Sequence, residues 1–174
     1  MYSKEPGPPK YIQFYWTKSE LFDNISLRTT YRAKTIKNEK GEALLAEYAM
    51  SNDEKDAFTL FVKKAIYDVL DIVLKMTTGV ESQPIAIDET IQVEFRSVPN
   101  AYGFKILDEE AYNINNLYTV DDGTRKYIDA HIMAAWYQLV GLKQEQAEWD
   151  MERDTAKTDL INNRLFQLKK AKLG

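Results

Sequence analysis

The chain has 174 residues, 44% of them hydrophobic, which is enough to bury the core of about one domain. Because 27 Asp and Glu residues outnumber 23 Lys and Arg residues, the net charge of -4 argues against broad binding to a nucleic-acid backbone. The lack of cysteine excludes disulfides and thiolate sites and suits a reducing cytoplasm. No stretch approaches the roughly 18 apolar residues of a membrane span, and no secretory signal pattern occurs, so we expect neither membrane insertion nor that export route.

Residues 1–16 predict an extended N-terminal arm rich in proline and aromatic residues. Prolines at 6, 8 and 9 flank Gly7 and exclude a helix there. Aromatic side chains follow directly at Tyr11, Phe14, Tyr15 and Trp16. Such a cluster either packs on the core of its own chain or docks on a neighbouring copy, and these four residues are therefore candidates for a subunit interface.

The segment from 17 to 174 predicts a single, mainly helical domain. Thr17 and Glu20 have the spacing of a capping box, so a helix begins there, although residues 25–33 also alternate like a strand. Residues 38–41 carry a turn signal. A second box, from Ser51 to Glu54, opens a helix to about Met76. Leu60, Ile72 and Leu74 widen its apolar stripe beyond one face, which predicts contacts on two sides.

Residues 84–107 predict a small antiparallel β-hairpin insert. Apolar and polar residues alternate from Ile91 to Arg96 and again from Tyr102 to Ile106, as they do in strands with one wet face. The intervening residues Val98-Pro99-Asn100-Ala101 have the composition of a turn.

Residues from about 120 to 170 predict a long C-terminal helix. They contain no proline, and Gly141 is the one glycine well inside the segment. Such a helix would be about 75 Å long, whereas a compact chain of this size has a radius of roughly 16 Å. The helix must therefore project from the domain or break, and Gly141 is the candidate break point. The expected fold class is mainly α: a helical bundle with this long C-terminal helix and the small β-hairpin insert.

The second half of this helix carries isolated apolar residues among many charges. Trp149, Met151 and Leu160 would suit a subunit interface, and the alternative is a return helix packed on the rest of the chain. The basic residues beyond them either stabilise the end of the helix or meet an acidic partner or nucleic acid; they are Arg164, Lys169, Lys170 and Lys172.

The sequence contains none of the common catalytic motifs. The one histidine, His131, lies in an apolar stretch of the long helix, where a core histidine is the simpler interpretation than a ligand or a base. Patterns for hydrolase nucleophiles, zinc proteases, P-loops and dinucleotide binding do not occur. Adjacent acids such as Asp121 and Asp122 more often serve a helix end than a metal. We therefore predict no catalytic, cofactor or metal site, and no enzyme.

The order of the elements resembles that of the head-to-tail connector proteins of tailed bacteriophages, also called adaptor or neck-ring proteins. The resemblance covers about residues 44–174: the capped helix after EALLAEYAMSNDEKDAF, the strand insert, and KYIDAHIMAAWYQLVGLKQEQAEWD before a basic end. It is strongest with divergent versions from phages of gut Bacteroidetes. The N-terminal arm departs from the minimal connector.

The resemblance implies a structural virion protein of the neck, assembled in the cytoplasm of the host bacterium. It implies a ring of twelve copies beneath the portal, joined to portal and tail proteins, with DNA passing through it without sequence recognition and with no membrane partner. An acidic subunit would let the DNA slide. The basic residues from Arg164 to Lys172 would instead contact the portal, a tail protein or the DNA. Two other hypotheses stay open: a helical binding or regulatory module inside cells, and an enzyme built without histidine or cysteine chemistry.

Overall fold

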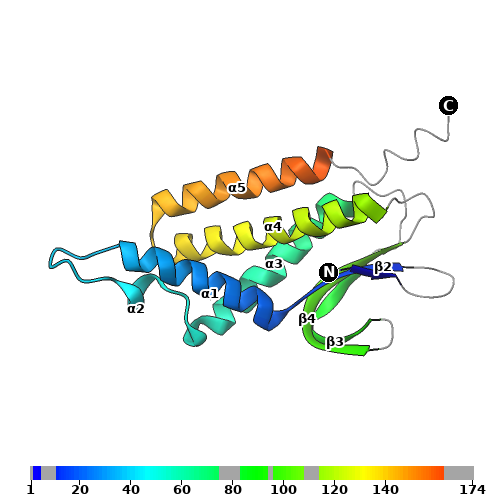
Figure 1. Ribbon diagram of the computed structural model, residues 1–174, viewed down its shortest axis with the longest axis horizontal. Helices are drawn as coiled ribbons and strands as arrows, with labels where there is room; N and C mark the ends of the chain where they lie inside the picture. The colour runs from blue at the N-terminus through cyan, green and yellow to red at the C-terminus, as the bar shows by residue number, and fades with distance from the viewer. Residues whose placement is uncertain (1, 5–10, 75–82, 94–95, 108–113, 163–174) are drawn as a thin grey trace.

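Four long helices and a small antiparallel sheet make up the described part of the chain (Figure 1). The computed structural model describes residues 2–4, 11–74, 83–93, 96–107 and 114–162. The long helices are α1 (Lys18–Thr35), α3 (Lys55–Leu74), α4 (Ile114–Leu139) and α5 (Lys143–Asn162). Shorter turns are α2 (Leu45–Tyr48) and η1 (Asn52–Glu54), and the strands are β1 (Tyr2–Lys4), β2 (Tyr11–Thr17), β3 (Gln83–Val93) and β4 (Arg96–Leu107). The mainly helical fold class is confirmed.

Both predicted capping sites begin helical segments. The Thr17 hydroxyl accepts a hydrogen bond from the backbone N–H of Glu20 at 3.3 Å, and α1 then continues to Thr35, which excludes the strand alternative. At the second site, Ser51 and Glu54 form the complete reciprocal box before η1 and α3. At Thr17 only the hydroxyl half of the predicted box is present, because the Glu20 carboxylate pairs with Arg125 instead. Each site still satisfies an amide donor that a helix start leaves unpaired, so the local sequence fixes where both helices begin.

The predicted turn at residues 38–41 is present. The N–H of Gly41 donates to the carbonyl of Asn38 at 2.9 Å, and Gly41 has a φ of 78°. The side-chain oxygen of Asn38 also accepts from the N–H groups of Lys40 and Glu42. An Asx-type contact and a left-handed glycine together reverse the chain between α1 and α2.

The helix α3 is buried on one face only among its described side chains. Phe58, Val62 and Val69 are fully buried, whereas Leu60 is 65% exposed. Of the three residues predicted to widen the buried stripe, Leu60 is therefore wrong, Ile72 is buried at 8% exposed, and the side chain of Leu74 lies outside the described residues. Residues 75 and 76, with which the predicted helix ended, lie outside the described residues.

The sheet has the strand order β1-β2-β4-β3, and every neighbouring pair is antiparallel. The predicted hairpin is confirmed as β3 and β4, but the turn predicted at residues 98–101 is wrong because β4 runs through it. Asn100 has a φ of 49° there, and the pairing of β3 with β4 shifts register nearby. A bulge, not a turn, explains the turn-like composition, and the strands curve in Figure 1.

Residues 2–4 and 11–16 of the N-terminal arm form part of the chain's own sheet, whereas its prolines lie outside the described residues. β2 lies between β1 and β4, and its residues Phe14, Tyr15 and Trp16 are at most 3% exposed. A Cβ atom on Gly103 would lie 2.0 Å from the carbonyl oxygen of Phe14, so the close approach of β2 to β4 requires glycine at that position. The intramolecular alternative for the aromatic cluster is the one that the structure shows.

The predicted C-terminal helix is a pair of antiparallel helices, α4 and α5, within the described residues. The uninterrupted helix over residues 120–170 is therefore wrong, the predicted break at Gly141 is confirmed, and residues 163–170 lie outside the described residues. The chain reverses at Gly141, which has a φ of 80°. The N–H of Leu142 donates to the carbonyl of Tyr137 at 2.9 Å, and the N–H of Gly141 donates to that of Gln138 at 3.3 Å. These two bonds form a Schellman motif, which ends α4 and turns α5 back along it (Figure 1).

The helix α4 lies between the other long helices and provides much of the core. Residues on α4 such as Ile128, Ile132 and Trp136 are buried with residues of α1 and α3. The indole N–H of Trp136 also donates to the carbonyl of Tyr48 at 2.9 Å and so holds α2 against the bundle. Within the described ranges, none of the helices combines the length and apolarity needed to cross a bilayer.

Candidate functional site

Three of the four aromatic residues proposed as interface contacts belong to the protein core. The rings of Phe14 and Trp16 have centroids 5.2 and 6.2 Å from that of Phe104 on β4. Tyr15 beside them is 3% exposed. These side chains are therefore already covered by their own chain, which corrects their assignment to a subunit contact. Tyr11 pairs with Leu107 through the backbone, and its side chain lies outside the described residues.

The apolar residues of α5 divide between the core and the surface. Leu160 is 1% exposed, and its side chain occupies the space beside Gly123 of α4, where an added Cβ would come within 2.9 Å of it. Trp149 is half-buried, and the guanidinium of Arg28 lies 5.6 Å from its ring centroid. Met151 is 71% exposed. Leu160 and Trp149 therefore fit the alternative in which this helix packs on the rest of the chain. Of the three residues, Met151 alone remains an exposed candidate for a subunit interface.

The basic residues Arg164, Lys169, Lys170 and Lys172 lie outside the described residues. Their contact with a portal, a tail protein or DNA stays a prediction.

Two exposed apolar pairs lie on α1 and α3 instead. Leu27 and Tyr31 on α1 are 57% and 62% exposed, and Leu60 and Tyr67 on α3 are 65% and 57% exposed. We call these pairs the α1 face and the α3 face. The sequence alone did not mark these residues as exposed, because Leu27 and Tyr31 fit an alternating strand and Leu60 fits a second buried stripe.

Helical geometry sets both faces opposite the core. At about 100° per residue, Leu27 and Tyr31 lie roughly opposite Ile25 and Thr29, which are fully buried. The same spacing sets Leu60 and Tyr67 opposite the buried face of α3. Because both helices direct their buried faces to a common core, the α1 face and the α3 face both point away from that core.

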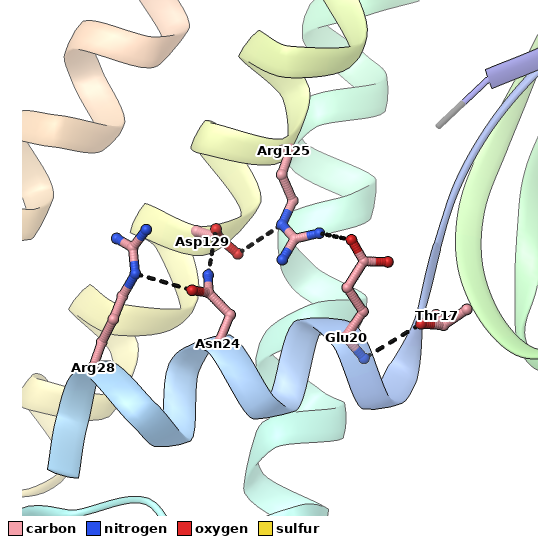
Figure 2. A network of polar contacts seen from close by, with 6 residues as sticks. All are labelled: Thr17, Glu20, Asn24, Arg28, Arg125 and Asp129. Atoms are coloured by element: carbon pink, nitrogen blue, oxygen red, sulfur yellow. Dashed lines mark hydrogen bonds and ion pairs between the residues drawn. The ribbon is translucent and has the colours of Figure 1, made fainter.

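A polar network fixes the position of α1 on α4 (Figure 2). Arg125 on α4 bridges the helices, since its Nη1 lies 3.1 Å from the carboxylate of Glu20 and its Nε lies 3.1 Å from that of Asp129. Asn24 on α1 donates to the other oxygen of Asp129 at 2.8 Å and accepts from Arg28 at 3.2 Å. These bonds hold the helix that carries the α1 face.

Burial affects the charge of the network's central carboxylate. Asp129 is 7% exposed, and its desolvation raises its pKa, while the nearby charge and hydrogen bond of Arg125 oppose that rise. Two donors, from Asn24 and Arg125, satisfy its oxygens. The arrangement suits a structural contact between helices, because its charged groups pair with one another.

A cleft of about 450 Å³ lies where α3, α4 and α5 meet. The predicted core histidine, His131, is indeed buried, with its side chain 7% exposed, but it also lines this cleft. Its Nδ1 lies 3.7 Å from Asp68 and makes no hydrogen bond to the described residues. Burial lowers its pKa, an effect that Asp68 opposes and Arg153 reinforces.

Metal ligands do not cluster in the described ranges, where no three His, Asp or Glu side chains come together in a geometry for an ion. Comparison with known proteins gives no match to a family model, to a curated protein or to a solved structure.

Proposed function

We propose that this chain is a structural virion protein that forms a ring at the portal-tail junction of a tailed bacteriophage. The ring, of twelve copies, would enclose the DNA channel and join the capsid portal to the tail, and it would be assembled in the host bacterial cytoplasm. The resemblance of residues 44–174 to connector proteins supports this proposal. The helical bundle with its small antiparallel sheet is compatible with it.

The observation that carries the proposal is the pair of outward faces on α1 and α3. Each presents two large apolar side chains to solvent, a feature that often marks contacts with other molecules when such side chains gather. A closed ring needs two different patches on every subunit, so that one patch meets the other on the next copy. The α1 face and the α3 face supply two non-equivalent patches, which would pair head to tail around the ring.

The charge of the chain fits a passage for DNA. With a net charge of -4, a subunit repels the phosphate backbone, so a ring of such subunits would let DNA slide without gripping it. Portal, neck and tail proteins would be the neighbours above and below this ring.

A pair of double variants tests the head-to-tail contact. One carries Leu27→Asp and Tyr31→Asp, and the other carries Leu60→Asp and Tyr67→Asp; Tyr118→Asp, an exposed aromatic outside both faces, is the control. Light scattering after gel filtration should show rings for the wild type and the control, and monomers for each double variant alone. Because each variant keeps one intact face, their equimolar mixture should form dimers and nothing larger.

The same experiment has outcomes that overturn the proposal. Rings that persist in both double variants would show that these faces do not join the subunits. A defect in only one double variant would show an isologous contact, which pairs a face with itself and gives a dimer. Circular dichroism of every variant checks that the helices remain folded.

A second candidate is a helical module that binds an intracellular partner as a monomer or dimer. The observation in its favour is that α5 folds back on α4 instead of projecting from the domain (Figure 1). This candidate predicts a chain that stays at the mass of a monomer or dimer at every concentration and in the presence of a portal complex. The ring proposal predicts a large closed assembly, formed by the chain alone or on the portal.

A further inference from the structure

The cleft between α3, α4 and α5 leaves apolar surface uncovered. Its volume of about 450 Å³ falls within the usual range of roughly 300 to 1,000 Å³ for ligand pockets, so it has room for a few side chains of a bound segment. Phe61, Ala134, Ala135 and Leu139 form its apolar lining, and Leu139 is 61% exposed. Because removing apolar surface from water is favourable, a segment with apolar side chains would be stabilised here.

The charges at this cleft sum to about one negative charge. Five charged side chains stand there: Asp68, Asp150, Asp154, Lys64 and Arg153. Arg153 is shared between Asp150 at 2.9 Å and Asp154 at 4.0 Å. Asp68 is 44% exposed and faces His131 at 3.7 Å, and burial lowers the pKa of that histidine and so keeps it neutral. The cleft therefore favours a cationic partner over an anionic one.

The last twelve residues of the sequence, 163–174, have the composition that such a partner needs. We call this segment the C-terminal tail. It contains no acid and four cations, which are Arg164, Lys169, Lys170 and Lys172. It also contains four large apolar residues, which are Leu165, Phe166, Leu168 and Leu173. The tail thus complements both the apolar lining and the charge of the cleft.

The tail starts close enough to the cleft to reach it. It follows Asn162, the last residue of α5, and α5 runs sixteen residues, about 24 Å, from there back to Gln146 in the lining. Twelve extended residues span up to about 40 Å. The return path is acidic, because α5 carries six acids and three bases. Since a short tether gives an effective concentration in the millimolar range, the chain's own tail has the advantage over that of another copy.

We propose that the C-terminal tail docks in the cleft of its own chain. Its cations would pair with Asp68 and with acids of α5, and Phe166 with its neighbouring leucines would cover Phe61 and Leu139. A portal or tail protein that binds these cations would then have to displace the tail from the cleft. The α1 face and the α3 face do not line the cleft, so this docking does not depend on the ring.

The lack of cysteine allows a direct test with engineered disulfides in the full chain. Two double variants join the tail to the cleft: Ala171→Cys with Gln146→Cys, and Ala171→Cys with Gln138→Cys. The control combines Ala171→Cys with Glu148→Cys, an exposed residue of α5 whose charge acts on Arg32 of α1. Equilibration with reduced and oxidised glutathione, followed by non-reducing gels and mass spectrometry, gives the effective concentration of each pair of thiols within the chain.

At least one cleft pair should have an effective concentration about tenfold or more above that of the control, the usual effect of burying a large apolar side chain. Adding Phe166→Ser to that pair should bring the value down to the control, whereas Gln167→Ser, the matched change beside it, should not. Asp150→Asn should lower the value about threefold, as expected for a solvent-exposed ion pair. Glu152→Gln should leave it unchanged, because Glu152 lines a different pocket, with Arg28.

Three results would overturn the proposal. Equal effective concentrations in the cleft pairs and the control would show that the tail has no preferred place on the chain. Disulfides that form between chains more readily than within them would assign the tail to another copy. Equal effects of Phe166→Ser and Gln167→Ser would show that the apolar lining does not hold the tail. Circular dichroism of each variant checks that the helices remain folded.

Discussion

Arg32 on α1 donates from Nε to the carboxylate of Glu145 on α5 at 3.1 Å, and its Nη2 donates to the same oxygen. The two residues are 113 positions apart in the sequence, so their contact joins the first long helix to the last. Glu145 is 8% exposed, whereas the side chain of Arg32 is 41% exposed. The pair therefore fixes α1 to the start of α5, close to the turn at Gly141.

Glu145→Ala should destabilise the fold. The variant leaves Arg32 without its partner, and losing a partly buried charged hydrogen bond should lower the free energy of unfolding by about 1 to 3 kcal/mol. Urea denaturation followed by circular dichroism measures the change. Asp122→Ala is the control, since its ion pair with Lys126 is exposed and should contribute less than about 1 kcal/mol. Equal effects of the two variants would contradict this account.

Gly141→Ala should destabilise the turn between α4 and α5 without a steric clash. Gly141 has a φ of 80°, and an added Cβ would meet no atom within 4 Å. The loss should therefore reflect backbone conformation alone, at about 1 kcal/mol in the free energy of unfolding. Gly141→Asn should cost less, because asparagine tolerates the left-handed region better. Thermal unfolding of the three proteins compares them, and an unchanged midpoint for Gly141→Ala would refute the argument.

Thr29→Val should destabilise the junction between α1 and the segment before α3. The hydroxyl of Thr29 accepts from the N–H of Met50 at 2.9 Å and donates to the carbonyl of Ile25 at 3.0 Å. Valine keeps the shape but leaves the buried N–H of Met50 unpaired, which should lower the free energy of unfolding by about 1 to 3 kcal/mol. The control is Thr59→Val on α3, whose hydroxyl donates only to the Lys55 carbonyl at the surface. Its expected change is within about 0.5 kcal/mol.

The stability of the fold should depend on pH through His131. Its pKa in the folded protein is lowered from the ordinary 6.5, chiefly because burial disfavours the charged ring. The unfolded chain then binds the proton more readily than the folded one. The contribution of neutral His131 to the free energy of unfolding is therefore complete above about pH 6.5 and is lost as the pH falls toward the folded pKa. Between pH 7.5 and 5.5 the urea midpoint of the wild type should decrease, and that of His131→Gln should decrease less.

Asp129 should change the stability with pH in the opposite direction to His131. Burial raises the folded pKa of Asp129 above 3.8, so the folded state holds that proton more tightly, and stability from this group falls as the pH rises through the folded pKa. The two residues thus act in opposite directions. The difference in pH dependence of stability between the wild type and His131→Gln reports the effect of His131 alone. An identical pH dependence of the two proteins would contradict a role of His131 in it.

Local signals in the sequence predicted the helix starts and the break. Thr17 and Ser51 carry the hydroxyl that a capping box needs, and Gly141 has the freedom that a Schellman turn needs. Each of these features acts within about six residues. The sequence therefore specifies them without knowledge of the rest of the chain.

Features that depend on distant partners were not predictable in the same way. The pairing of β2 with β4 joins Phe14 to Phe104, 90 positions later, and nothing near Phe14 indicates that partner. The bulge at Asn100 resembles a turn locally, and only the continued pairing of β4 with β2 identifies it as part of a strand. Likewise Leu60 was assigned to a buried face, because hydrophobicity alone does not distinguish a core residue from an exposed one.

The central claim of this account is that the chain closes into a ring through the α1 face and the α3 face. Light scattering after gel filtration, over a range of protein concentrations, tests it most directly. The account predicts a mass that rises with concentration to a limit near twelve times the 20.2 kDa subunit, about 240 kDa. A mass that stays at that of a monomer or dimer at every concentration, with or without a portal complex, would contradict it.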